Sequence, residues 1–314
     1  MYIKLQKLSA ATLLFFLMLF VACDKSDPLQ SSAAAQKLKV VATTGMVADL
    51  VRQVGGERAE IKTLMGPGVD PHVYKASSAD AMNLSQADLI FYSGLRLEGR
   101  MEELFKRLEK SGKNILPLTR SIPKEKLLSP PDFAEHFDPH VWFDVAMWSE
   151  TLPVILEGFV AADPEGEAYY RENTKALSEK LRMLDSWCKA KAGELDESKR
   201  ILVTSHDAYN YFGRAYGFRV VGLQGLSTVS EAALSDMVSL VDFLKKKKIK
   251  AIFVESSVNP AAMKRVAQDS GCEIGGELFS DAIGQPGEQR LGFDVGTYEG
   301  AVKYNITRIV EALK

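Results

Sequence analysis

Two kinds of apolar pattern alternate along the chain. Short runs of consecutive apolar residues predict buried strands, and apolar residues that recur every three or four positions predict amphipathic helices. Strands are predicted at 39–44, 59–64, 87–92, 114–118, 201–204, 219–222, 251–255 and 273–276. Helices are predicted at 46–54, 77–84, 101–108, 144–160, 207–216, 230–247, 260–269 and 298–313. Strands that alternate with helices form parallel sheets with right-handed crossovers, so the predicted fold class is α/β.

The longest helical pattern starts at Asp163, the expected N-cap, has Pro164 in the first turn and ends near 195. It carries one apolar stripe, formed by Leu177, Leu181, Leu184 and Cys188. A helix of about 30 residues would span about 45 Å. We interpret it as a rigid connector between two lobes, which argues against wide hinge opening. The alternative, a coiled-coil dimer arm, is disfavoured because the heptad pattern is too brief, and we expect a monomer.

These elements predict an N-terminal α/β lobe at 37–162, the connecting helix at 163–195 and a C-terminal α/β lobe at 196–314. Each lobe should contain a parallel sheet flanked by helices. A chain of 314 residues is long enough for two such cores.

The N-terminus has the pattern of an exported protein. Lys4 and Lys7 precede an apolar stretch at 8–21, which is too short to be a spanning helix. A small residue then stands directly before Cys23, as in a bacterial lipobox. We predict a signal peptide at 1–22, lipidation of Cys23 and a tether at 23–36, in preference to an ordinary cleaved signal peptide. The protein would then be extracytoplasmic, anchored in the periplasm or on the outer face of the cytoplasmic membrane.

Composition narrows the possible partners. The net charge of −2 and the absence of a basic patch interleaved with aromatic residues exclude nucleic acid as an expected partner. Cys188 and Cys272 have no spacing that suggests a disulfide framework or a zinc site, so we expect two free, half-buried thiols.

Three of the four histidines stand in comparable contexts. His206 follows the apolar run 201–204 after one serine, whereas His72 and His140 each follow an Asp-Pro pair. Proline fixes its own φ and restricts the residue before it, so each Asp-Pro-His presents its imidazole from a stiff backbone. Singly, each histidine could be an ordinary core or surface residue; together they suggest one metal site assembled from distant loops. His136 is expected to be a bystander.

Asp281 follows an apolar run in the second lobe and could add a carboxylate, although alone it resembles a turn aspartate. Three imidazoles and one carboxylate suit zinc and, less selectively, manganese, iron and copper. Two ligands from each lobe would place the ion in the cleft between the lobes. No HExxH motif and no closely spaced Cys pair is present, which argues against a HExxH protease and a zinc finger.

The sequence resembles a known family, the TroA-like zinc- and manganese-binding receptors of ABC importers. The matching segments are 70–74, 138–142, 204–209, 211–217, 222–228, 253–257 and 276–281. The resemblance implies two α/β lobes joined by one rigid helix. It implies His72, His140, His206 and Asp281 as ligands, a divalent metal as cargo and a membrane permease as partner.

The resemblance also bears on the metal. The third ligand position holds histidine, where several manganese receptors of the family carry glutamate, and the loop 121–139 lacks the histidine-rich stretch of zinc-specialised members. The chain therefore resembles a mixed zinc and manganese branch. Two alternatives remain: a zinc-dependent hydrolase, because three histidines and a water are typical of catalytic zinc, and a surface adhesin, because the anchor permits one.

Overall fold

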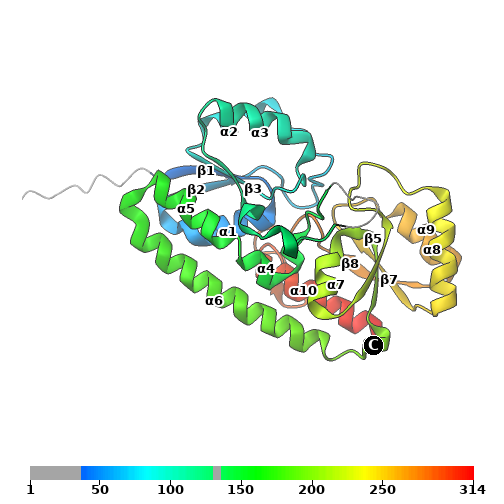
Figure 1. Ribbon diagram of the computed structural model, residues 1–314. Coiled ribbons are helices and arrows are strands. Elements are labelled where there is room, and N and C mark those ends of the chain that lie inside the picture. Colours follow the sequence, from blue (N-terminus) through cyan, green and yellow to red (C-terminus); the bar gives the residue numbers. More distant parts are fainter. Residues whose placement is uncertain (1–36, 130–135) are drawn as a thin grey trace, which may run out of the picture. The chain divides into compact units, whose positions relative to one another are not determined.

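The computed structural model describes residues 37–129 and 136–314 (Figure 1). The predicted signal peptide, the lipidation site Cys23 and the tether lie outside the described residues. We call the elements before the long helix α6 the first lobe and those after it the second lobe. The exact lobe boundaries given above remain predictions.

The first lobe contains a four-stranded parallel sheet in the order β2-β1-β3-β4. Its strands are β1 Leu38–Ala42, β2 Ala59–Thr63, β3 Leu89–Tyr92 and β4 Ile115–Pro117. Val40 and Ala42 belong to the cluster that contains helices α1 Gly45–Gly55 and α5 Leu152–Ala162. Val41 belongs to the cluster with α2 Ser78–Gln86 and α3 Glu102–Lys110. Successive strand residues point to opposite faces, so the sheet is buried on both sides.

The second lobe contains two parallel strand pairs, β5-β6 and β7-β8, with β5 beside β7. The strands are β5 Ile201–His206, β6 Arg219–Gln224, β7 Ala251–Glu255 and β8 Glu273–Leu278. Helices α8 Leu234–Lys247 and α9 Ala261–Ser270 share one hydrophobic cluster with these strands. Helices α7 Asn210–Tyr216 and α10 Tyr298–Leu313 belong instead to the large cluster that contains α1 and α5 of the first lobe.

The predicted fold class is confirmed: two α/β lobes are joined by one long helix (Figure 1). Helix α6 runs from Glu167 to Ala192 and contacts α1 and α5 of the first lobe and α7 and α10 of the second. All four residues of its predicted stripe are buried. The helix begins after a 3-10 turn at Pro164–Gly166 rather than at the predicted Asp163 cap. The Asp163 carboxylate instead accepts hydrogen bonds from Arg58, at 2.7 and 2.9 Å, and from the Tyr170 hydroxyl.

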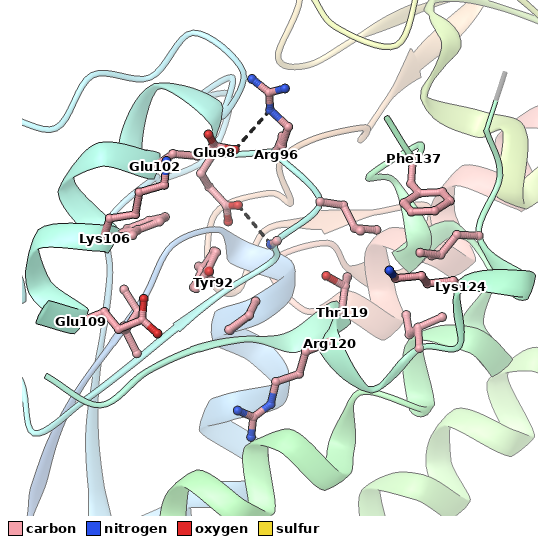
Figure 2. A pocket seen from close by; sticks show the side chains of 17 residues that line it. Tyr92, Arg96, Glu98, Glu102, Lys106, Glu109, Thr119, Arg120, Lys124 and Phe137 are labelled. Carbon is pink, nitrogen blue, oxygen red and sulfur yellow. Dashed lines mark hydrogen bonds and ion pairs between the residues drawn. The ribbon is translucent and has the colours of Figure 1, made fainter. Parts of the chain in front are cut away.

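A buried carboxylate shapes the turn after β3. Glu98 accepts hydrogen bonds from the Thr43 hydroxyl at 2.7 Å and from the backbone N–H of Ser93 at 2.8 Å and Gly94 at 3.3 Å. These bonds hold a left-handed backbone at Leu95 and Arg96, with φ of 51° and 66°. The turn borders a cavity of about 520 Å³ between α3 and β4 (Figure 2). Burial raises the pKa of Glu98 despite its hydrogen bonds.

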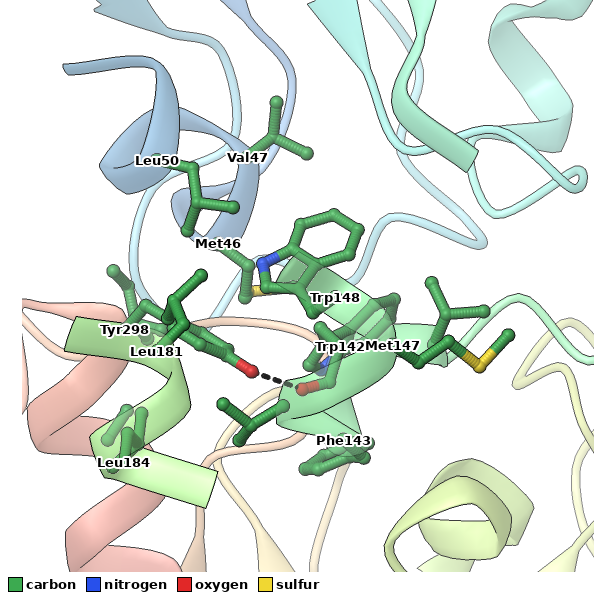
Figure 3. Close-up of a cluster of buried hydrophobic side chains, with 14 of the residues drawn as sticks. Met46, Val47, Leu50, Trp142, Phe143, Met147, Trp148, Leu181, Leu184 and Tyr298 are labelled. Carbon is green, nitrogen blue, oxygen red and sulfur yellow. Dashed lines mark hydrogen bonds between the residues drawn. The ribbon is translucent and has the colours of Figure 1, made fainter. Parts of the chain in front are cut away.

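The hydrophobic core is continuous between the lobes. Met46, Val47 and Leu50 of α1, the tryptophans Trp142 and Trp148, and Leu181 and Leu184 of α6 lie in one cluster with Tyr298 of α10 (Figure 3). The Tyr298 hydroxyl donates a hydrogen bond of 2.5 Å to the carbonyl of Trp142. The lobes therefore share apolar contacts as well as a connecting helix.

The helix predicted at 144–160 is two helices, α4 Val145–Ser149 and α5. Pro153 has no N–H to donate to the carbonyl of Ser149, so a single helix cannot run through this point. The stretch 145–162 has the length and hydropathy of a membrane span, but half of it is buried inside the fold. It is a core element of the first lobe.

Two other helix starts differ from the prediction. Helix α8 begins at Leu234, not after Ser230, because the Asp236 carboxylate accepts from the N–H of Ala233 at 3.1 Å and fixes the start there. The segment after β5 begins as a 3-10 turn, Asp207–Tyr209, without a side-chain cap. The Asp207 carboxylate accepts from the N–H of Gly222 instead.

Strand β7 and helix α10 coincide with their predicted bounds, whereas the hairpin of β9 Gln289–Arg290 and β10 Phe293–Asp294 was not predicted. Its strands have two residues each, which is too short for a periodic signal. Cys188 and Cys272 are free thiols, as predicted, although Cys188 is fully buried.

Stability should respond to pH through Glu98. A carboxyl whose pKa is raised by folding loses stability as pH rises from its unfolded pKa to its folded pKa. Relative to Glu98→Gln, the wild-type protein should lose about 1.4 kcal/mol of unfolding free energy for each unit by which the pKa is raised. Urea unfolding at several pH values above 4 measures this difference. The control Glu109→Gln, at an exposed position of α3, should follow the wild type. A constant offset between Glu98→Gln and wild type across this range would contradict the assignment.

Helix α6 should depend on its buried stripe. Leu184→Ala removes a side chain that is 2% exposed and should cost about 2–5 kcal/mol of unfolding free energy. The neighbouring Met183 is 52% exposed, and Met183→Ala should change stability by less than about 0.5 kcal/mol. Urea unfolding of the metal-free variants measures the stability change of each substitution. Equal costs would mean that this face of α6 is not packed against the lobes.

Candidate metal centre

Four residues predicted from the sequence come together between the lobes. His72 lies in the loop between β2 and α2, and His140 directly precedes a 3-10 turn at Val141–Phe143. His206 is the last residue of β5, and Asp281 follows β8. Only His206 occupies the end of a strand, as predicted; the other two histidines lie in loops.

The side-chain tips of these residues converge on one point. Nε2 of His140 lies 3.2 Å from Nε2 of His72 and 3.4 Å from Nε2 of His206. Carboxylate oxygens of Asp281 lie 3.3 Å from Nε2 of His206, 3.5 Å from that of His140 and 3.8 Å from that of His72. One atom from each residue can be chosen so that all four lie within 4.8 Å of one another.

Two of the imidazoles are oriented from behind by carboxylates. Nδ1 of His140 lies 2.7 Å from Oδ1 of Asp138, and Nδ1 of His206 lies 2.6 Å from Oε2 of Glu255. In each case the carboxylate also accepts the backbone N–H of the same histidine, at 2.9 and 3.0 Å. A carboxylate at Nδ1 places a proton there and turns Nε2 toward the shared point.

Without a metal, the members of the cluster differ in charge. Burial lowers the pKa of His72 to about 3, so this imidazole is neutral. Burial alone would lower the pKa of His206, but Glu255 and Asp281 raise it well above the usual value. Burial alone would raise the pKa of Asp281, yet His206, with His72 and His140, lowers it well below the usual range. Without a metal, His206 is therefore an imidazolium between two carboxylates.

Solvent reaches the cluster from one side. His140 and His206 are fully buried and Asp281 is 1% exposed, whereas His72 is 5% exposed. His72 lines a cavity of about 340 Å³ together with Pro139 of the first lobe and Leu226, Ser227 and Val229 of the second. His72 is thus the member of the cluster that borders the opening.

The Asp281 segment is held by neighbouring side chains. The carbonyl of Phe279 accepts from the Tyr209 hydroxyl at 3.0 Å and from the Asn305 amide at 2.7 Å. The indole N–H of Trp142 donates to the carbonyl of Ser280 at 3.1 Å. The Trp142 ring also packs edge-on against His140, with ring centroids 5.2 Å apart. Trp142 therefore connects the His140 loop of the first lobe to the Asp281 segment of the second.

Other predicted residues lie elsewhere. His136 is exposed, and Nη1 of Arg96 lies 2.8 Å from its Nε2, so it is separate from the cluster. Sequence reasoning did not assign the orienting carboxylates Asp138 and Glu255. The repeated Asp-Pro-His contained a signal for Asp138. Glu255 is 49 residues from His206 and reaches it only because β5 and β7 are neighbours.

Fold and geometry together define a two-lobed α/β protein with a buried cluster of three histidines and one aspartate between the lobes. A family model described as "ZnuA: Zinc-uptake complex component A periplasmic" matches residues 40–312. The chain belongs to this family.

Individual relatives span nearly the whole chain. The manganese-binding lipoprotein MntA of Bacillus subtilis strain 168 is 42% identical, over 97% of this chain and 98% of that protein. The metal ABC transporter substrate-binding lipoprotein FimA of Streptococcus parasanguinis is 32% identical, over 98% and 99%. The solved structure of the periplasmic zinc binding protein TroA from Treponema pallidum has a TM-score of 0.83 at 42% identity, covering 88% of this chain and 99% of that one.

Proposed function

We propose that this protein is an extracytoplasmic, lipid-anchored receptor that captures one divalent metal ion, zinc or manganese, and delivers it to the membrane permease of an ABC importer. The ion is cargo, bound by His72, His140, His206 and Asp281. The protein is a monomer that performs no catalysis. Membership of the family and the names of the relatives, which include a metal ABC transporter substrate-binding lipoprotein, support this proposal.

The observation that carries the proposal is the state of Asp281. Its carboxylate is 1% exposed, and neither oxygen has a hydrogen-bond partner among the described residues. A buried carboxylate that accepts no hydrogen bond is costly, even though the nearby His206 imidazolium offsets part of its charge. The neighbouring atoms of the cluster are imidazole Nε2 atoms, which become electron-pair donors once His206 loses its proton. A cation at their centre would satisfy all four groups together.

The separations of the donors also fit a metal ion. For a tetrahedral site with bonds of about 2.0–2.1 Å, donor atoms stand about 3.3–3.4 Å apart. The separations of 3.2 and 3.4 Å from Nε2 of His140 to Nε2 of His72 and His206, and the shortest Asp281–His206 separation of 3.3 Å, agree with this value. The 3.8 Å separation between Asp281 and His72 leaves room for a slightly larger ion.

The donors admit both candidate metals. Neutral imidazoles suit zinc, a carboxylate accommodates manganese, and zinc generally binds more tightly at such donors. Relatives of nearly equal similarity are named for either metal: MntA of Bacillus subtilis is 42% identical and the zinc-binding protein TroA of Treponema pallidum is 43% identical. Affinity alone therefore would not identify the metal that is carried in the cell.

The geometry disfavours the hydrolase alternative. Catalytic zinc keeps a position open for water, whereas here four protein groups already surround the centre. The buried Glu255 could have supplied a general base, but it contacts His206 on Nδ1, the side away from the centre. The adhesin alternative draws no support from a buried site of this kind.

Removing the Asp281 carboxylate should abolish tight metal binding. We expect the purified chain from residue 24 onward to bind one zinc or manganese ion, and Asp281→Ala to weaken binding by at least about 100-fold, because a charged ligand is lost. Native mass spectrometry gives the stoichiometry and titration against a chromophoric chelator gives the affinity. Residues 37–314 form one compact unit, so omitting the N-terminal residues should leave folding intact.

The matched control is Asp269→Ala, which removes an exposed carboxylate from α9 and should leave metal affinity unchanged. Stoichiometric binding that persists in Asp281→Ala with the wild-type affinity would contradict the proposed metal site. Uptake of radioactive zinc or manganese by cells, lost when the receptor is deleted and restored by the wild type but not by Asp281→Ala, would establish delivery.

Orientation of His206 by Glu255 should also matter. Glu255→Gln keeps the size of the side chain but removes the charge that supports Nδ1, and should lower zinc affinity by about tenfold. Chelator competition measures the change. Glu277→Gln, at an exposed position of β8 in the same lobe, should have no effect. Equal affinities for Glu255→Gln and wild type would show that the negative charge behind Nδ1 does not contribute, because the Gln amide oxygen can still accept from Nδ1–H.

A further inference from the structure

The two Asp-Pro-His segments use their aspartates in the same way within the first lobe. Oδ1 of Asp70 accepts the backbone N–H of His72 at 2.8 Å. Oδ1 of Asp138 accepts the backbone N–H of His140 at 2.9 Å. Each bond spans two residues and fixes the local turn that presents the imidazole. One oxygen of each aspartate is therefore committed to its own segment.

The second oxygen of each aspartate is bonded to the other lobe. The Thr228 hydroxyl donates to Oδ2 of Asp70 at 2.5 Å, and the Asn210 side-chain amide donates to Oδ2 of Asp138 at 3.2 Å. Thr228 lies in the loop between β6 and α8, and Asn210 is the first residue of α7. The Tyr211 hydroxyl adds a bond of 2.9 Å to the carbonyl of Asp138. Both ligand-bearing loops of the first lobe are thus held by the second.

The support of His206 is different. Its carboxylate partner, Glu255, belongs to β7 of the same lobe, and β7 lies beside β5, which carries His206. A displacement of one lobe relative to the other leaves the His206–Glu255 pair intact. The same displacement would break the bonds of Thr228 and Asn210. Among the three histidine ligands, the two of the first lobe are therefore the ones whose positions depend on contact between the lobes.

We propose that Thr228 and Asn210 are positioning residues that retain the cargo by holding, from the second lobe, the aspartates that fix the His72 and His140 segments. Metal retention then depends on contact between the lobes. This inference rests on the proposed function. Carboxylate hydrogen bonds of this kind are charge-assisted and among the stronger ones in proteins. Partners of metal ligands typically alter metal affinity by about 10–100-fold.

The position of Thr228 also suggests the exit. Its neighbours Leu226, Ser227 and Val229 line the cavity that His72 borders, so the bond to Asp70 holds this loop across the opening. Once the bond is lost, water can reach the ion from the His72 side. Release is then ligand exchange: each metal–imidazole bond and the metal–carboxylate bond to Asp281 is replaced by a metal–water bond, and the ion keeps its charge.

The off-rate of the ion tests the inference. Zinc-loaded protein is mixed with excess chromophoric chelator, and zinc release is followed by absorbance. Thr228→Val removes the hydroxyl at nearly constant volume and should speed release about tenfold, and Asn210→Ala should act similarly. The double variant should release zinc faster than either single variant. Thr228→Ser keeps a hydroxyl at this position, so its off-rate should stay within about twofold of the wild type. A defect in packing alone would not distinguish the Ser variant from the Val variant in this way.

The control variant is Ser230→Ala, which removes an exposed hydroxyl from the same loop and should release zinc at the wild-type rate. Melting curves of the metal-free variants show whether each one folds, and the Ser and Val variants at 228 provide a folded pair for comparison. If Thr228→Val and Asn210→Ala both keep the wild-type off-rate while Asp281→Ala has lost zinc, the coupling is wrong and the proposed function stands. If the wild type itself binds no zinc, the proposed function fails first.

Discussion

The buried carboxylate of Asp281 is the constraint on which the rest of the structure depends. Two more buried carboxylates, Asp138 and Glu255, stand behind the histidines that face it. A buried carboxylate is costly unless positive charge or hydrogen bonds offset it. The protein can supply that charge by protonating His206, and a divalent cation at the centre supplies more of it. The site therefore favours a cation over an empty, fully deprotonated state.

That constraint explains why the site lies between the lobes. Each lobe contributes two of the four groups, so neither lobe alone holds the complete set of ligands. The continuous core around Trp142, Trp148 and Tyr298, together with α6, keeps the two halves of the site in register. Trp142 contributes to both the core and the site. It belongs to the core cluster, packs against His140 and donates a hydrogen bond to the carbonyl of Ser280.

Much of the fold could be predicted because apolar periodicity is a local property. Strand β7 and helix α10 match their predicted bounds, and the buried stripe of α6 was identified from spacing alone. The prediction failed where side chains choose partners that are distant in the sequence. Asp163 binds Arg58 instead of capping α6, and the helix predicted from 207 begins as a 3-10 turn while Asp207 binds the N–H of Gly222.

The same reasoning applies to the site. The Asp-Pro-His repeats and the polar end of β5 marked three residues of the cluster, because stiff turns and strand ends leave local signatures. The hydrogen bonds that hold them have no local signature. Glu255 reaches His206, and Thr228 reaches Asp70, only after the strands of one lobe and the two lobes themselves are assembled.

The continuous core also sets a limit on how the cargo can leave. Exposing even about 200 Å² of apolar surface between the lobes would cost about 5 kcal/mol, so wide opening is an expensive route. Hydrogen bonds fail over much shorter distances. The bonds of 2.5 and 3.2 Å to Asp70 and Asp138 would be lost after a displacement of about 0.3–1 Å, since a hydrogen bond beyond about 3.5 Å is negligible. A small shift of the lobes would thus loosen two ligands while the core stays closed.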